Sequence, residues 1–132
     1  MSTQETVVVT SKEELKAIID AAALDADLNY LDVSAITDME SLFAWTNFNG
    51  NISNWNVSRV VNMGLMFENS YFDGDISKWN VSNVEDMLCM FAYSKFNGDI
   101  SNWDVSGAVE MHHMFLESQF TGDISKWHNQ PT

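Results

Sequence analysis

Residues 74–82 read GDISKWNVS, and this stretch returns along the chain at a fixed step. Residues 50–58 read GNISNWNVS, residues 98–106 read GDISNWDVS, and residues 122–127 read GDISKW. A weaker copy, DLNYLDVS, occupies residues 27–34. The tryptophans of the four stronger copies lie 24 residues apart, at positions 55, 79, 103 and 127. A fixed period of about 20–50 residues is typical of proteins built from stacked structural repeats.

The composition indicates one folded domain with an acidic surface. The chain has 132 residues, of which 45% are hydrophobic, so it is long enough to bury a core. Its formal net charge is −13, from 19 Asp and Glu against 6 Lys and Arg. A surface of this sign repels nucleic acid and anionic lipid and attracts basic proteins.

Cysteine content and the N-terminal sequence indicate the compartment. Cys89 is the sole cysteine, which excludes an internal disulfide and fits a reducing environment. The first ten residues, MSTQETVVVT, contain no basic region and no long apolar run, so we expect no secretory signal and no membrane span. The chain as given therefore predicts a cytoplasmic protein, or a surface or secreted one from which a leader has been removed.

Residues 1–26 lie outside the repeat and predict an N-terminal cap made of one strand and one helix. The β-branched run TVVVT at residues 6–10 favours a strand. Ser11 and Glu14 match a capping box, in which the Ser11 hydroxyl accepts from the Glu14 amide. The apolar residues that follow, Leu15, Ile18 and Ile19, share one helical face. Such a cap would keep water from the first repeat.

Each repeat predicts a strand, a short helix and a glycine turn. The spacing of Ile52, Trp55, Val57 and Val60 matches the strand pattern of leucine-rich repeats, with Trp in place of one Leu. The stripe of Met63, Met66 and Phe67 then has helical spacing, and a serine such as Ser58 stands where an N-cap belongs. A Phe-x-Gly triplet ends the unit, with the glycine expected to supply a positive φ.

The predicted fold is therefore an α/β, right-handed, leucine-rich-repeat-like solenoid. It would contain about five 24-residue coils over residues 27–127, between the cap at 1–26 and a C-terminal tail at 128–132. No polar cap is evident after the last repeat. Either the chain is a piece of something longer, or another subunit covers the last coil. The second interpretation predicts a homodimer formed end to end through the final coil, with an interface at Trp127, Ile124 and Phe120.

The unit W-[ND]-V-S-x-V-x-x-M-x-x-M-F, followed by F-[ND]-G-D-I-S, closely resembles the BspA-type leucine-rich-repeat surface proteins of bacteria and mycoplasmas. The resemblance covers residues 27–127, where Trp, Val-Ser, Met, Phe and GDIS keep their register. It implies an extended binding surface on a repeat scaffold and, in surface members, adhesion to host or neighbouring proteins. It implies no catalytic residue.

The polar rows of the repeat leave few candidates for chemistry. An acidic row could bind calcium, but we favour the interpretation that each side chain caps backbone amides of a turn, because no EF-hand loop is present. The serine that follows the isoleucine in each repeat has no neighbouring base to activate it as a nucleophile. His112 and His113 are expected at the surface, without further side chains that could complete a metal site. We expect no enzyme, no cofactor and no resident metal. The acidic row consists of Asp27, Asn51, Asp75, Asp99 and Asp123.

The residues that recognise a partner should lie at the positions where the repeats differ from one another. Aromatic and leucine side chains at variable positions are typical of interface cores, and they occur here at Trp45, Tyr71, Tyr93 and Leu116. The leading hypothesis is a non-catalytic module that binds a basic protein. The alternative is an acidic mimic of nucleic acid that inhibits a DNA- or RNA-binding protein; an enzyme is the weakest hypothesis because no catalytic constellation is evident.

Overall fold

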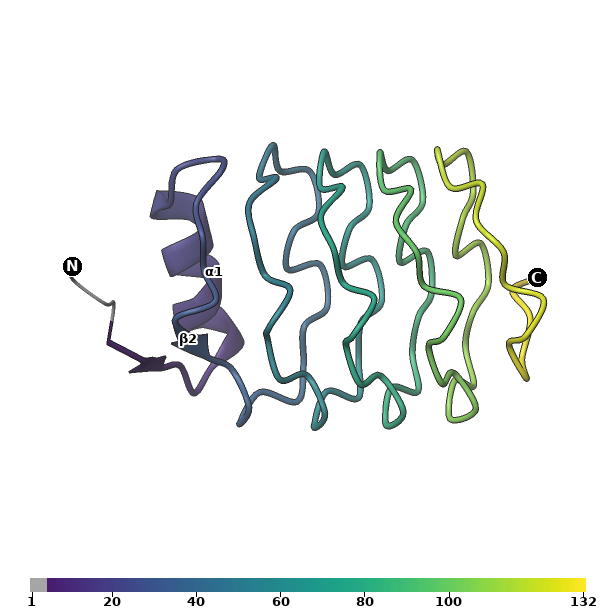
Figure 1. Ribbon diagram of the computed structural model, residues 1–132, viewed down its shortest axis with the longest axis horizontal. Coiled ribbons are helices and arrows are strands. Elements are labelled where there is room, and N and C mark those ends of the chain that lie inside the picture. Colours follow the sequence, from purple (N-terminus) through teal and green to yellow (C-terminus); the bar gives the residue numbers. More distant parts are fainter. Residues whose placement is uncertain (1–4) are drawn as a thin grey trace.

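The computed structural model describes residues 5–132 and opens with two short regular elements. Strand β1 (Val7–Val8) precedes helix α1 (Lys12–Ala21), which packs at the N-terminal end of the molecule through Leu15 and Ile19 (Figure 1). The Ser11 hydroxyl accepts a 3.1 Å hydrogen bond from the Glu14 amide, as the capping box predicts. The region predicted as the cap thus contains a strand and a helix; residues 1–4 of its predicted range lie outside the described residues.

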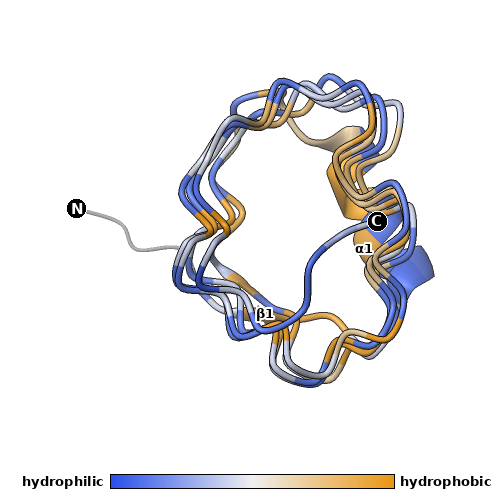
Figure 2. Cartoon of the chain, turned by 90° about the vertical axis from the view of Figure 1, so that its right-hand side faces the viewer, coloured by the Kyte–Doolittle hydropathy of each residue, from blue (hydrophilic) through white to orange (hydrophobic). Residues whose placement is uncertain are grey.

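The rest of the chain consists of turns, with one further short strand. Strand β2 (Leu31–Asp32) pairs in parallel with β1, with Val7 opposite Leu31 and Val8 opposite Asp32. Within residues 5–132, α1, β1 and β2 are the regular elements, and isolated parallel bridges join neighbouring repeats elsewhere. Successive repeats lie side by side along the long axis, and the end-on view superposes their traces (Figures 1 and 2).

The predicted α/β, right-handed, leucine-rich-repeat-like solenoid of about five strand–helix coils is therefore wrong. In the segment expected to be helical, alternate amides donate to the following repeat instead of to a carbonyl four residues earlier. The amides of Met63, Leu65 and Phe67 reach the carbonyls of residues 86, 88 and 90 at 2.8–2.9 Å. A segment of so few residues gains little from helix formation, so bonds to the next repeat prevail.

Of the predicted repeat strands, the described chain has only β2 in the first copy; in the later copies the same residues close β-turns. The amide of Trp55 donates to the Ile52 carbonyl at 3.2 Å, and that of Val60 donates to the Val57 carbonyl at 3.0 Å. Asn56 reinforces the bend, since its Oδ1 accepts from the Ser58 amide two residues later. Ser58 and its equivalents therefore belong to side-chain-closed turns and do not act as helix N-caps.

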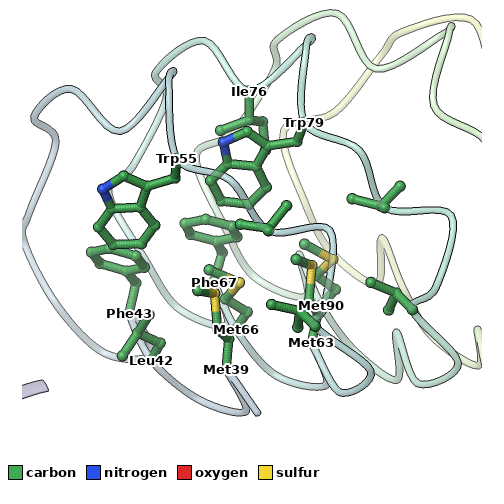
Figure 3. Close-up of a cluster of buried hydrophobic side chains, with 14 of the residues drawn as sticks. Met39, Leu42, Phe43, Trp55, Met63, Met66, Phe67, Ile76, Trp79 and Met90 are labelled. Carbon is green, nitrogen blue, oxygen red and sulfur yellow. The ribbon is translucent and has the colours of Figure 1, made fainter. Parts of the chain in front are cut away.

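The core is a set of aromatic and methionine columns running through the repeats. Phe43, Phe67 and Phe91 stack with ring centroids 5.4 and 5.5 Å apart, and the tryptophans and methionines lie beside them (Figure 3). The repeated methionines and tryptophans are core residues, and all of these are at most 5% exposed: Met39, Met63, Met66, Met87, Met90, Met111, Met114, Trp55, Trp79, Trp103 and Trp127.

Each buried indole also makes a hydrogen bond to the preceding repeat. The Nε1–H group of Trp79 donates to the Ile52 carbonyl at 3.1 Å, and that of Trp103 donates to the Ile76 carbonyl at 3.0 Å. A buried indole N–H left without a partner would be costly, so this bond fixes both the orientation of the ring and the register between repeats.

The glycine of the Phe-x-Gly turn is required for space and not for its φ angle. No described glycine has a positive φ, contrary to our expectation. A Cβ added to Gly74 would lie 2.8 Å from two atoms of the Phe72 ring and 3.2 Å from the Gly50 carbonyl oxygen. The turn therefore needs glycine because the phenylalanine ring of the same turn packs directly over its backbone.

We expect Gly74→Ala to lower the free energy of unfolding by about 1–3 kcal/mol, the usual cost of overpacking a core. Urea denaturation would measure the change. Gly64→Ala is the control, because a Cβ there approaches nothing closer than 3.1 Å, and its nearest neighbour is the Asp86 carboxylate. An equal loss for both variants would show that contact with the Phe72 ring is not the cause.

Candidate functional site

Two positions in every repeat hold the backbone in the left-handed region. In one row the φ angles of Trp45, Asn69, Tyr93 and Glu117 lie between 51° and 61°. A second row, four residues earlier in each repeat, behaves in the same way. Such angles cost non-glycine residues roughly 1–2 kcal/mol, and asparagine tolerates them best. Asn69 therefore suits its position, whereas Trp45 and Tyr93 do not.

The four residues expected to bind a partner are all at the surface. The exposed fractions are 73% for Trp45, 55% for Tyr71, 50% for Tyr93 and 37% for Leu116. Backbone contacts place them on neighbouring repeats: the Tyr71 amide donates to the Thr46 carbonyl at 3.2 Å, and the Tyr93 amide donates to the Leu116 carbonyl at 2.8 Å. We call Trp45, Tyr71, Tyr93 and Leu116 the aromatic strip.

One residue of this region was missed from the sequence. The Lys95 ammonium lies 5.9 Å from the centroid of the exposed Tyr71 ring, within the range of a cation–π contact. Lys95 follows Tyr71 by one repeat length of 24 residues, and that offset in the sequence could have revealed the pair.

Two glutamate residues lie beside the aromatic strip along the backbone of the repeats. The Glu68 carbonyl accepts from the Trp45 amide at 2.9 Å, and Glu117 occupies the position equivalent to Tyr93 in the next repeat. Partial burial raises the pKa of the Cys89 thiol, and the negative charges of Glu68, Glu110 and Asp86 raise it further. This thiol is therefore a poor nucleophile at neutral pH.

The acidic row closes turns, as predicted. The Asp99 Oδ1 atom accepts from the Ser101 amide at 3.0 Å and from the Ser101 hydroxyl at 2.7 Å. These bonds, the hydroxyl's first, lower the pKa of Asp99. The hydroxyls of Ser77 and Ser101 thus donate to the carboxylate of their own turn. The same amide bond recurs at Asp27, Asn51, Asp75 and Asp123.

The residues of the predicted end-to-end interface are less accessible than expected. Trp127 is only 4% exposed, whereas Phe120 and Ile124 are half-buried. Polar side chains of the C-terminal tail cover the last repeat, which the sequence had suggested was uncapped: the Asn129 amide donates to the Val105 and Ala108 carbonyls, and Gln130 donates to those of Ile124 and Trp127. Figure 2 shows the tail crossing the end of the molecule. The homodimer stays a prediction.

Residues 5–132 contain neither a cluster of metal-ligating side chains nor a membrane-spanning helix. No group of three or more His, Cys, Asp or Glu side chains is arranged to hold a metal ion in this range. His112 and His113 are exposed, and their rings touch at a centroid distance of 3.8 Å. None of the described helices has the length and apolarity needed to span a bilayer.

Comparison with protein-family models gives one match, over residues 13–127. The chain belongs to the family described as "Mycoplasma protein of unknown function, DUF285". The match includes all of α1 except its first residue and all the repeats that carry the aromatic strip. Neither the curated proteins nor the solved structures contain a match to the chain.

Replacing the two left-handed aromatic residues should stabilise the fold. We expect Trp45→Asn and Tyr93→Asn each to raise the free energy of unfolding by up to about 1 kcal/mol, because asparagine relieves the backbone cost and little burial is lost. Urea denaturation would measure the change. The reverse substitution at the equivalent position, Asn69→Trp, should lower the free energy of unfolding. If these positions were helical, asparagine would instead lower stability by up to about 0.7 kcal/mol.

Proposed function

We propose that this protein is a non-catalytic module that binds other proteins through the aromatic strip. The observation that carries the proposal is the exposure of Trp45 and Tyr93 at left-handed positions. Asparagine, which the chain has at the equivalent position 69, would stabilise the fold more at these positions. Residues that oppose stability and face solvent are typical of functional surfaces.

The strip has the composition of an interface core. Tryptophan and tyrosine contribute a large share of the binding energy at protein interfaces, because they bury a large area for few rotatable bonds. The inter-repeat hydrogen bonds hold the backbone beneath these side chains, so association costs little ordering of the main chain. Leu116, beside Tyr93, extends the apolar area.

The charge of the protein favours a basic partner. A net charge of −13 on 132 residues attracts positively charged proteins over a distance of about 10 Å at 0.1 M salt. Such attraction raises the association rate and selects against acidic partners. The acidic mimic of nucleic acid stays an alternative from the sequence. The aromatic strip favours the protein-binding module over it.

The biological setting we propose follows the resemblance to BspA-type surface proteins. Membership of the mycoplasma family is compatible with that resemblance, and the family description leaves the function open. Adhesion to a host or neighbouring protein is the role that the resemblance supports. In that role the stacked repeats would hold the aromatic strip outward.

The experiment compares the proteins retained from a host-cell extract by the immobilised wild-type chain and by the double variant Trp45→Asn/Tyr93→Asn, with quantification by mass spectrometry. We expect a set of basic proteins that is retained by the wild type, lost from the double variant and weakened by salt. The triple variant D75N/D99N/D123N controls for charge, because asparagine keeps the turn-closing bond. Identical sets from the wild type and the double variant would contradict the proposed function.

A further inference from the structure

We infer that the aromatic strip binds an arginine-rich segment of the partner protein, with guanidinium groups lying on the exposed rings of Trp45, Tyr71 and Tyr93. This inference rests on the proposed function and specifies the chemistry of its partner. It combines three observations: a cation already placed on one of these rings, exposed rings in the neighbouring repeats, and glutamates at or next to the equivalent positions of other repeats.

The contact between Lys95 and Tyr71 shows how the strip receives a cation. The ammonium lies 5.9 Å from the ring centroid, and both side chains are exposed. The Lys95 amide donates to the Ser70 carbonyl at 3.0 Å, which fixes the lysine backbone beside the tyrosine of the preceding repeat. Lys95 thus occupies a place that a partner cation would take, and it competes with the partner for Tyr71.

Trp45 and Tyr93 have no such internal cation in the described structure. Of the six basic residues, Lys12 and Lys16 are ion-paired in or beside α1, with Asp38 and Asp20. The position equivalent to Lys95 in the first repeat is Asn47, which carries no charge. Both rings are therefore open to a cation from outside, with exposed fractions of 73% and 50%.

The carboxylates make the strip favourable for cations and unfavourable for a second copy of this acidic chain. Glu68 lies next to Asn69, the residue equivalent to Trp45, and Glu117 is the residue equivalent to Tyr93. A positive segment would gain from these charges along its whole length.

Arginine fits better than lysine because the strip offers flat rings. A guanidinium group is planar, stacks on aromatic faces and is less strongly hydrated than an ammonium group. On exposed rings, the cost of removing water decides how much of the cation–π attraction remains. The strip should therefore distinguish arginine from lysine at equal charge.

The test uses three fluorescein-labelled ten-residue peptides, alternating Arg-Gly, Lys-Gly and Glu-Gly, with binding followed by fluorescence anisotropy at physiological salt. We expect the Arg-Gly peptide to bind several-fold more tightly than the Lys-Gly peptide and the Glu-Gly peptide not to bind. Trp45→Asn/Tyr93→Asn should weaken Arg-Gly binding by about tenfold and abolish the preference for arginine. This variant is expected to fold at least as stably as the wild type.

A second pair of variants tests the role of Lys95. Lys95→Gln frees the Tyr71 ring and should raise the affinity for the Arg-Gly peptide more than Lys78→Gln does, although both remove one positive charge from an exposed position. Equal effects of the two lysine variants would contradict competition for Tyr71.

The outcomes separate this inference from the proposed function. Equal affinity of the Arg-Gly and Lys-Gly peptides, or an Arg-Gly affinity that the double variant leaves unchanged, would overturn the inference. If the double variant still lost the proteins retained from the extract, the module would bind proteins through different chemistry, and the proposed function would stand.

Discussion

The structure depends on hydrogen bonds that join each repeat to the next through alternate amides. Residues 63, 65, 67 and 69 donate to residues 86, 88, 90 and 92, while the amides between them close turns within their own repeat. To aim alternate amides in this way, the backbone must enter the left-handed region at two positions per repeat. Trp45 and Tyr93 each stand at such a position, and both are exposed.

Side chains reinforce the same register from inside and outside. Inside, each buried tryptophan donates to a carbonyl of the preceding repeat at 2.9–3.1 Å, and the phenylalanine rings stack from repeat to repeat. Outside, Asn49, Asp73 and Asn97 each accept from the amide 24 residues later at 2.7–2.8 Å. A shift of one residue would break all of these bonds together, so the repeats form a stiff support for the aromatic strip.

The repeat register and the core could be predicted from the sequence, but the local backbone could not. Recurrence of Trp, Met and Phe at one step identifies residues that pack against their own copies, and these are buried. The spacing of Val60, Met63, Met66 and Phe67 fits a helical face, yet it fits a series of three-residue turns equally well. Sequence periodicity alone does not determine which carbonyl accepts the hydrogen bond of each backbone amide. The helix prediction was wrong for this reason.

The candidate site was predictable in position and not in detail. Trp45, Tyr71, Tyr93 and Leu116 differ from their equivalents in other repeats, and the structure places all four at the surface. Their backbone angles, and the Lys95 ammonium on Tyr71, follow from the turn geometry and could not be anticipated once a helix was assumed. The buried Trp127 was missed for a similar reason, since Asn129 and Gln130 act through side-chain amides that match no repeat position.

In the proposed function, the exposed rings of the aromatic strip form the binding surface. Four of the five tryptophan indoles donate to buried carbonyls, whereas Trp45 is 73% exposed. The most direct measurement is a ¹H–¹⁵N NMR titration with the Arg-Gly peptide that follows the indole and backbone resonances. We predict that the Trp45 indole and the amides of Tyr71 and Tyr93 shift while the four buried indoles stay in place. Shifts confined to the acidic row at Asp75, Asp99 and Asp123, with an unchanged Trp45 indole, would contradict the account.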